Sequence, residues 1–368
     1  MANRVVLELG TSARNKRNSE GAFVTLASGR IVLIYTKYGV DHGDEGAAVL
    51  ASRYSDDGGK TWTGRDRVVI QNEGKRNVMS VSLLRLHDGR ILLGYLRKDG
   101  WGKCMPLVRF SDDELRTVSR PRSVLIEPGY HVLNNDRIVQ LTSGRLIAPV
   151  ALHRQTRPIT LHETGRRGTT MTGAALILYG LSDDGGRSWF ESTNAIYKGF
   201  TNGVGMQEPG VVELADGRLW SWARAGGEHL DGTGTYQWQM FSDDGGCTWS
   251  EAARSGFISP CSPMSVKRIP STGDLLAVWN DISGRYKVKA AERSWRRTPL
   301  VCAVSGNEGK TWRHHKALEK EPSRGYCYTA IHFVGDAVLL GYCAGGGRDG
   351  MVLDTLRVRR MSIDALYG

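Results

Sequence analysis

The sequence predicts an all-β fold of six four-stranded antiparallel blades, and three observations lead to this prediction. Glycine is frequent, with 46 residues, and no helical period of apolar residues persists for long. A glycine turn followed by an apolar strand recurs along the chain. An acidic motif that ends in tryptophan follows most of these turns. The two interleaved series predict a single domain over residues 1–368.

The turn series, with strings such as SGRIVLIY and DGRILLGY, sets the length of the repeating unit. Its members begin at Ser28, Asp88, Ser143, Asp216, Thr272 and Gly335. Six units in 368 residues give about 61 residues each, which suits a four-stranded blade with its loops.

The acidic motif is typified by the string SDDGGKTW. Intact copies begin at Ser55, Ser182 and Ser242, a variant begins at Ser305, and a worn copy begins at Ser111. We expect its second aspartate to accept hydrogen bonds from backbone N–H groups of its own turn, and its tryptophan to pack on the blade. The spacing lacks the distal glutamate of an EF-hand calcium loop, so we predict no metal site.

The last unit lacks one strand. No acidic motif follows the turn at Gly335, and the chain ends after the strand GMVLDTLRVRRMSI. We therefore expect the N-terminal segment RVVLEL to supply the outer strand, which closes the ring and protects strand edges that would otherwise be open.

The first strand of each unit is expected to begin near the axis of the ring, so that equivalent positions face a common centre. Counting eight residues back from the residue before each turn glycine selects Glu20, Ser80, Asn135, Glu208 and Met264. In the sixth unit the turn is irregular, and the candidates are Tyr326 and Tyr328. The apolar spacing that follows the other positions favours Tyr328.

A glutamate and a tyrosine at this centre form a chemically sensible pair. The Glu208 carboxylate can take the phenol proton of Tyr328, and the phenolate oxygen can then attack an anomeric carbon.

The repeated S-x-D-x-G-x-T-W string resembles the Asp-box repeat of the sialidase (neuraminidase) superfamily, and the resemblance spans nearly the whole chain. It implies a six-bladed β-propeller. It also implies an exo-α-sialidase-like retaining glycoside hydrolase that releases a terminal sialic acid or related nonulosonic acid from glycans. No metal or organic cofactor is implied.

The resemblance also implies roles for individual arginines. The segment QEPGVVELADGRLWSWAR is similar to the sialidase segment that holds the glutamate and the second arginine of a carboxylate-binding triad, which points to Glu208 and Arg224. Arg297 lies eight residues before the box at Ser305, where sialidases place their third arginine. Three guanidinium groups would grip one carboxylate by bidentate hydrogen bonds.

The chain departs from the family at the first arginine and at the acid/base aspartate. The R-I-P motif is replaced by RNKRNSEGAF, with Ser19 and Glu20 where R-I would fall. Arg17 is the candidate, Arg14 is the substitute, and Glu20 is assigned to substrate binding.

The position that aligns with the acid/base aspartate is occupied by Ala47. Among the nearby carboxylates, Asp44 is the candidate, and Asp41 and Glu45 could take its place. Asp136, in the segment HVLNNDRIVQL, is a rival acid/base residue, and it is assigned to substrate binding together with Asn135.

Charge and composition restrict the class of binding partner and the cellular compartment that we expect. The net charge of +11 is spread along the chain without a block of five or six like charges, which favours an anionic glycan over nucleic acid. Six dispersed cysteines without a CxxC spacing predict mostly free thiols. Neither a signal peptide nor a transmembrane run is recognised, so we expect a cytoplasmic protein, or a secreted or periplasmic one whose signal has been removed.

Two further functions are compatible with the same sequence features. One is that of a related hydrolase or lyase that acts on another acidic sugar, a ulosonic or uronic acid. The second is that of a non-catalytic glycan-binding propeller.

Overall fold

The computed structural model describes residues 3–160, 167–198, 205–225, 236–347 and 350–368, with side chains left out between 156 and 172. In this part of the chain nearly all regular structure is β-strand, which confirms the all-β prediction. The exceptions are a 3-10 turn, η1 (Glu292–Ser294), and a short C-terminal helix, α1 (Asp364–Tyr367). No helix in the described ranges is long and apolar enough to cross a membrane.

Four sheets contain four antiparallel strands each. The first is β2 (Asn18–Thr25), β3 (Ile31–Tyr38), β4 (Ala48–Ser55) and β5 (Arg67–Ile70). The second is β16 (Met206–Glu213), β17 (Leu219–Ala225), β18 (Tyr236–Ser242) and β19 (Ala253–Ile258). The third is β20 (Ser265–Arg268), β21 (Leu275–Asn280), β22 (Leu300–Ser305) and β23 (Arg313–Glu319). The fourth is β1 (Asn3–Leu9), β26 (Leu356–Ser362), β25 (Ala337–Cys343) and β24 (Cys327–Val334).

The remaining sheet has ten strands. One part of it contains β6 (Asn77–Arg85), β7 (Ile91–Gly100), β8 (Lys103–Ser111) and β9 (Arg122–Ser123). Another contains β11 (Val139–Gln140), β12 (Leu146–Thr160), β13 (Arg167–Ser182), β14 (Phe190–Glu191) and β15 (Ile196–Tyr197). The short strand β10 (Tyr130–Val132) joins the two parts, because it pairs with β12 in antiparallel and with β8 in parallel orientation.

The prediction of a closed six-bladed propeller of four-stranded antiparallel blades is therefore wrong. The described chain forms sheets of four to ten strands, and none of them is closed or curled. The local cause is the segment around Tyr130. The Tyr130 ring stacks on the Trp101 ring, with ring centroids 6.3 Å apart. The Cys104 N–H donates a hydrogen bond to the Gly129 carbonyl, so β10 is held between β8 and β12.

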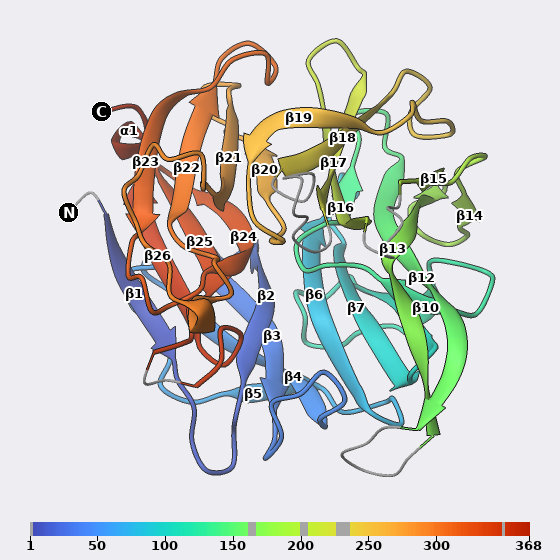
Figure 1. Ribbon diagram of the computed structural model, residues 1–368. Coiled ribbons are helices and arrows are strands. Elements are labelled where there is room, and N and C mark those ends of the chain that lie inside the picture. The colour runs from blue at the N-terminus through green and yellow to red at the C-terminus, as the bar shows by residue number, and fades with distance from the viewer. Residues whose placement is uncertain (1–2, 161–166, 199–204, 226–235, 348–349) are drawn as a thin grey trace.

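The expected partner of the N-terminal strand is confirmed. β1 pairs in antiparallel orientation with β26, from Asn3 opposite Met361 to Leu9 opposite Leu356. Figure 1 shows this blue strand beside the red strands of the C-terminal sheet.

The acidic boxes form turns, as expected. In the first box Ser55 Oγ donates to Asp57 Oδ1 at 2.8 Å, and the N–H groups of Lys60 and Thr61 donate to the same oxygen at 2.9 Å. The worn copy makes the same contacts between Ser111, Asp113 and Thr117. The repeated motif is explained by turn formation, because these hydrogen bonds recur wherever the motif occurs.

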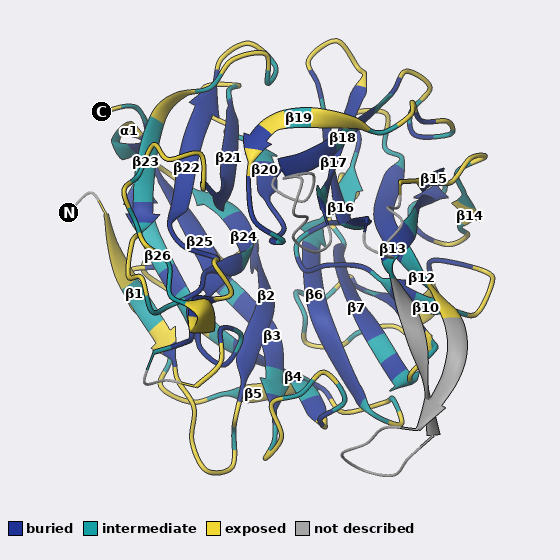
Figure 2. Cartoon of the chain, in the orientation of Figure 1, coloured by how far each residue is buried: buried dark blue, intermediate teal, exposed yellow. Residues whose placement is uncertain are grey.

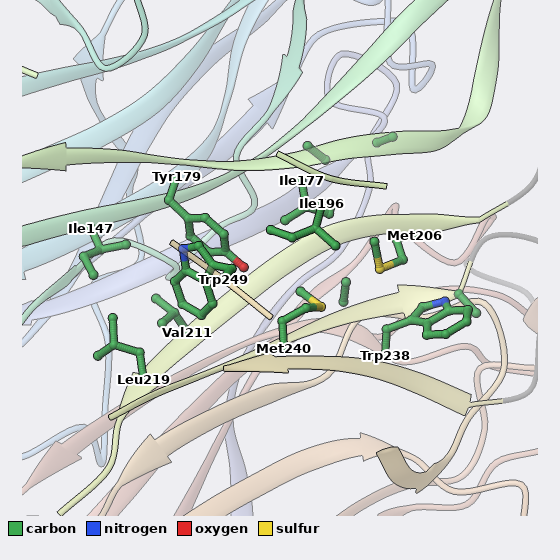
Figure 3. Close-up of a cluster of buried hydrophobic side chains, with 14 of the residues drawn as sticks. Ile147, Ile177, Tyr179, Ile196, Met206, Val211, Leu219, Trp238, Met240 and Trp249 are labelled. Atoms are coloured by element: carbon green, nitrogen blue, oxygen red, sulfur yellow. The ribbon is translucent and has the colours of Figure 1, made fainter. Parts of the chain in front are cut away.

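Apolar clusters between neighbouring sheets form the core, and Figure 2 shows the buried strands toward the middle of the molecule. One cluster lies between β12 and β13 of the ten-stranded sheet and the sheet β16–β19, as Figure 3 shows. The box residue Trp249 stacks on Tyr179 there, with ring centroids 3.9 Å apart, and donates from Nε1 to the Gly246 carbonyl. The box tryptophan thus joins two sheets.

The strands β2, β6, β16, β20 and β24 lie toward the middle of the view in Figure 1. They contact one another in the order β6, β2, β24, β20, β16. Four of the residues predicted to face a common centre lie near the beginnings of β2, β6, β16 and β24. They are Glu20, Ser80, Glu208 and Tyr328. Met264 directly precedes β20, and Asn135 lies between β10 and β11.

Candidate active site

A shared backbone irregularity marks the predicted central positions. Glu20, Ser80, Glu208 and Tyr328 all have positive φ, at 54°, 57°, 50° and 58°. Each lies inside a register shift near the start of β2, β6, β16 or β24. A bulge with a residue in the left-handed region is costly for a non-glycine residue and redirects its side chain. Strained backbone conformations of this kind cluster at functional sites, and their presence at four equivalent positions marks this region as a candidate site.

The third unit follows this pattern one residue later than the count predicted. Asp136, with φ of 57°, has the left-handed conformation, whereas Asn135 precedes it. The Asn135 amide donates to the carbonyls of Gly21 and Tyr328, at 2.8 and 3.0 Å. Asn135 therefore connects the segments that carry Glu20 and Tyr328.

Glu208, Tyr328 and Arg224 are in direct contact. The Tyr328 hydroxyl donates to Glu208 Oε1 at 2.9 Å, and Arg224 Nη1 lies 2.9 Å from Glu208 Oε2. Burial and the negative charge of Glu208 raise the pKa of Tyr328 well above its usual value, although Arg224 and Arg297 oppose this shift. The phenol is therefore neutral near pH 7 and points its proton at a carboxylate, which is the arrangement that general-base activation of a nucleophile requires.

Arg297 approaches the same centre from the segment before β22. Its guanidinium carbon lies 5.6 Å from the centre of the Tyr328 ring. Nε donates to the Cys261 carbonyl at 3.2 Å, and Nη1 donates to Cys327 Sγ at 3.1 Å. The side chain is only 6 % exposed, so a buried positive charge lies beside the tyrosine.

Arg17 is committed to neighbouring protein groups. Its Nη2 donates to Glu20 Oε1 at 2.9 Å, Nη1 donates to Asp44 Oδ1 at 2.6 Å, and Nε donates to Ser19 Oγ at 2.9 Å. Nη1 also donates to the carbonyl of His42, and the side chain is 2 % exposed. Most of the five N–H donors of this guanidinium are consumed inside the protein.

Glu20 is a second buried carboxyl group in the cluster. Its Oε2 accepts a hydrogen bond from Ser80 Oγ at 2.6 Å, and the side chain is 4 % exposed. Burial raises the pKa of Glu20, and the Arg17 charge opposes that shift. The negative charges of Asp44 and Glu208 also raise it.

Asp44 is accessible, since its side chain is 59 % exposed. Partial desolvation would raise the pKa of its carboxyl group, but the positive charges of Arg17 and Lys98 outweigh that effect and lower the pKa. The more distant Arg224 acts in the same direction. The Asp44 carbonyl accepts hydrogen bonds from Asn77 and Lys98, which fix the loop.

Asp136 is enclosed by structural contacts. Lys267 Nζ lies 3.0 and 3.1 Å from its two oxygens, and the Ile331 N–H donates to Oδ2 at 2.8 Å. These bonds join the third unit to β20 and β24. The structure therefore places Asp136 in a bridge between strands, whereas Asp44 faces solvent.

The remaining candidate residues lie apart from the cluster. Tyr326 is fully buried against apolar residues, with its ring 6.2 Å from that of Tyr342. Arg14 and Asp41 are exposed. Glu45 forms ion pairs with Lys98 at 2.6 Å and Arg76 at 3.3 Å.

Sequence reasoning missed several side chains that support the site. Gln207 Oε1 accepts two hydrogen bonds from Arg224, and Arg137 is buried with bonds to Met264 O and Ser265 Oγ. Cys327 holds Arg297. Gln207 and Cys327 each directly precede a central residue, and this adjacency is the one signal that could have revealed them.

Within the described residues, no group of three or more His, Cys, Asp or Glu side chains is arranged to hold a metal ion. The groups that the cluster offers for chemistry are carboxyl groups, a phenol and guanidinium groups.

Comparisons with known proteins agree with this picture. A family model described as a BNR repeat-like domain matches residues 83–340, and one described as a BNR/Asp-box repeat matches residues 53–63. The acidic-box turns and these two matches define the class as an Asp-box (BNR) repeat protein. The chain belongs to the BNR repeat-like domain family, whose model matches more than half of its length.

Solved structures show the same fold at low sequence identity. A protein of unknown function from Dyadobacter fermentans is 18 % identical, with a TM-score of 0.67 over 98 % of this chain and 99 % of that one. The intramolecular trans-sialidase from Ruminococcus gnavus is 16 % identical, with a TM-score of 0.69 over 98 % and 97 % of the two chains. A Trypanosoma rangeli sialidase is 17 % identical, with a TM-score of 0.67 over 96 % and 55 %.

No curated protein matches the sequence. The chain thus has a sialidase-like fold. The TM-scores compare the path of the backbone over the whole chain. The number of strands in each sheet is a separate property, because it depends on which neighbouring strands are hydrogen-bonded.

Proposed function

We propose that this protein is a retaining exo-glycosidase that removes a terminal sialic acid or a related nonulosonic acid from a glycan. The observation that carries the proposal is the 2.9 Å hydrogen bond from the Tyr328 hydroxyl to Glu208, beside the guanidinium groups of Arg224 and Arg297. The names of the structural neighbours, which include sialidases and trans-sialidases, support the same substrate class.

The reaction would proceed in two steps. Tyr328 Oη attacks the anomeric carbon while its proton passes to Glu208, and Asp44 gives a proton to the departing glycosidic oxygen. Water then cleaves the tyrosyl intermediate, and Asp44 takes up the proton from that water. Net retention follows from two displacements at one carbon.

The substrate carboxylate would be held mainly by Arg224 and Arg297. Arg17 is 2 % exposed and bonded to Glu20, Asp44 and Ser19, so it serves to position the two carboxyl groups. Two guanidinium groups still neutralise one carboxylate and hold it by charge-assisted hydrogen bonds.

The same observation favours a second candidate substrate class. With Arg17 turned to Glu20, the anion-binding set is smaller than the three-arginine set implied by the family resemblance. A different acidic sugar, a ulosonic or uronic acid, would then be the natural substrate of the same catalytic pair.

Hydrolysis of 4-methylumbelliferyl glycosides tests both candidates. We expect the sialoside to be cleaved by the parent protein, and Tyr328→Phe to reduce kcat by about 10³-fold or more because the nucleophile is lost. Tyr326→Phe is the matched control and should keep near-parental turnover. Analysis of the released sugar would distinguish free acid from an anhydro product.

Unchanged turnover in Tyr328→Phe would refute the proposed nucleophile. Cleavage of a uronide and none of any nonulosonic acid glycoside would favour the second candidate. Binding of glycans without turnover of either class would refute an enzymatic function.

A further inference from the structure

Two cysteines face each other directly behind the candidate site. Cys327 at the start of β24 is the register partner of Cys343 at the end of β25. Residues directly opposite in an antiparallel pair have Cα atoms about 4.5 or 5.5 Å apart. Disulfides span Cα separations of about 4.4 to 6.8 Å, so the backbone already has the spacing that a disulfide needs.

The two thiols also lie in one buried cluster. Both side chains are buried, and they pack together with Val352. Cys104 and Cys302 are equally buried but pair with residues other than cysteine, namely Lys98, Tyr130, Val278 and Lys316. The direct pairing therefore distinguishes Cys327 and Cys343 from these two buried thiols.

The surroundings make the two thiols chemically unequal. Arg297 Nη1 donates to Cys327 Sγ at 3.1 Å. Burial would raise the pKa of Cys327, but the neighbouring Cys343 thiol and the charge of Arg297 lower it. Burial raises the pKa of Cys343 well above its usual value. A thiolate next to a resolving thiol is the arrangement found in reversible redox pairs.

We propose that Cys327 and Cys343 are an oxidisable dithiol, which a peroxide converts to a disulfide that alters the position of Arg297. The Cys327 thiolate attacks one peroxide oxygen, giving a sulfenic acid and hydroxide. The Cys343 thiol then attacks the sulfenic sulfur, forms the S–S bond and releases water. Overall, two thiols and one hydrogen peroxide give one disulfide and two waters.

The site of this modification connects it to the proposed glycosidase function, on which its kinetic effect rests. Cys327 immediately precedes the partly buried Tyr328, and its own side chain is 1 % exposed, so oxidation requires the peroxide to enter past the site residues. In the disulfide, Cys327 Sγ is bonded to Cys343 Sγ, and its 3.1 Å contact with Arg297 Nη1 changes. Substrate carboxylate binding then weakens, while the contact between Tyr328 and Glu208 is less affected.

Peptide mapping of the full-length protein after hydrogen peroxide treatment tests the chemistry without reference to activity. We expect a cross-linked peptide pair containing Cys327 and Cys343, lighter by two hydrogen atoms, which dithiothreitol reverses. The exposed Met351 serves as an internal indicator that the oxidant acted. Sialoside kinetics should show KM raised about fivefold and kcat changed by less than about twofold.

Two variants separate a redox role from a structural one. Cys343→Ser should keep parental KM and become insensitive to this cross-link and its KM change. Cys104→Ser, a matched change at a buried thiol, should remain as sensitive as the parent. Absence of the cross-link when Met351 is oxidised would overturn the proposal, as would a cross-link that leaves KM unchanged. If the parent cleaves no sialoside, the cross-link alone decides whether the dithiol exists.

Discussion

At the scale of single residues, the surroundings of Asp44, which we propose as the proton donor, favour its ionised form. Arg17 Nη1 lies 2.6 Å from Asp44 Oδ1. Desolvation would raise the pKa of the Asp44 carboxyl group, but the charges of Arg17 and Lys98 lower it. A proton donor must be protonated in the reacting complex. The activity of this protein should therefore rise toward acidic pH.

A leaving-group comparison tests the role of Asp44. Asp44→Ala should reduce kcat/KM for sialyllactose by about 10²-fold or more, because its sugar leaving group needs protonation. The same variant should retain much more activity on the 4-methylumbelliferyl sialoside, whose leaving group departs as an anion. Asp41→Ala, in the same loop, is the control and should behave like the parent. An equal loss on both substrates would contradict the assignment.

At the scale of elements, the aspartates of the acidic boxes make the free energy of unfolding depend on pH. Hydrogen bonds from the Thr117 side chain and N–H lower the pKa of Asp113 to about 2. The corresponding pKa of Asp57 is also about 2, because bonds from Thr61 outweigh desolvation. A lowered pKa in the folded state stabilises the fold above the unfolded value of about 4, and this contribution is lost as pH falls toward 2.

The box at Ser305 provides the comparison for this effect. It carries Asn307, which makes the same turn contacts without titrating. We expect Asp113→Asn to weaken the dependence of unfolding free energy on pH between about 4 and 2, measured by urea denaturation. Asp112→Asn, next to it and outside the hydrogen-bonded set, should leave the pH dependence as it is. An unchanged pH profile in Asp113→Asn would refute the argument.

The N-terminal strand is a second element whose contribution can be measured. Leu9 is 8 % exposed and lies in an apolar cluster with Phe23 and Val358, between the first and last sheets. Leu9→Ala should lower the free energy of unfolding by about 2–4 kcal/mol. Val5→Ala, at an exposed position of the same strand, should cost less than about 1 kcal/mol. Equal effects would show that β1 packs loosely.

At the scale of the whole molecule, the net charge of +11 affects encounter with an anionic substrate. Salt shortens the range of this attraction from about 30 Å at 0.01 M to about 8 Å at 0.15 M. We expect kcat/KM for a sialoside to fall about twofold to fivefold over that interval, mainly through KM. A flat or rising dependence would show that the charge distribution does not steer the substrate.

Much of the site could be predicted from the sequence because the repeat supplies a coordinate system. Equal spacing from each turn glycine selected Glu20, Ser80 and Glu208, and apolar spacing selected Tyr328. Each of these four residues has a left-handed conformation within a bulge of its own strand. In the third unit the count selected Asn135, although Asp136 has the left-handed conformation, and in the fifth unit it selected Met264, which does not have positive φ. The sequence assigns Arg17 to substrate binding. It does not reveal that the N–H groups of Arg17 donate hydrogen bonds to Glu20 and Asp44, because these contacts depend on the folded arrangement.

Features that depend on neighbouring residues could be predicted from local patterns: the box turns, the apolar strands and the positions from which central side chains start. Which strands share a sheet and which charges meet could be learned only from the three-dimensional arrangement. β10 joined two expected units because Tyr130 stacks on Trp101, and Cys327 met Cys343 because β24 and β25 pair in that register. These contacts join residues that are distant along the chain, and their energies depend on three-dimensional geometry that local patterns do not encode.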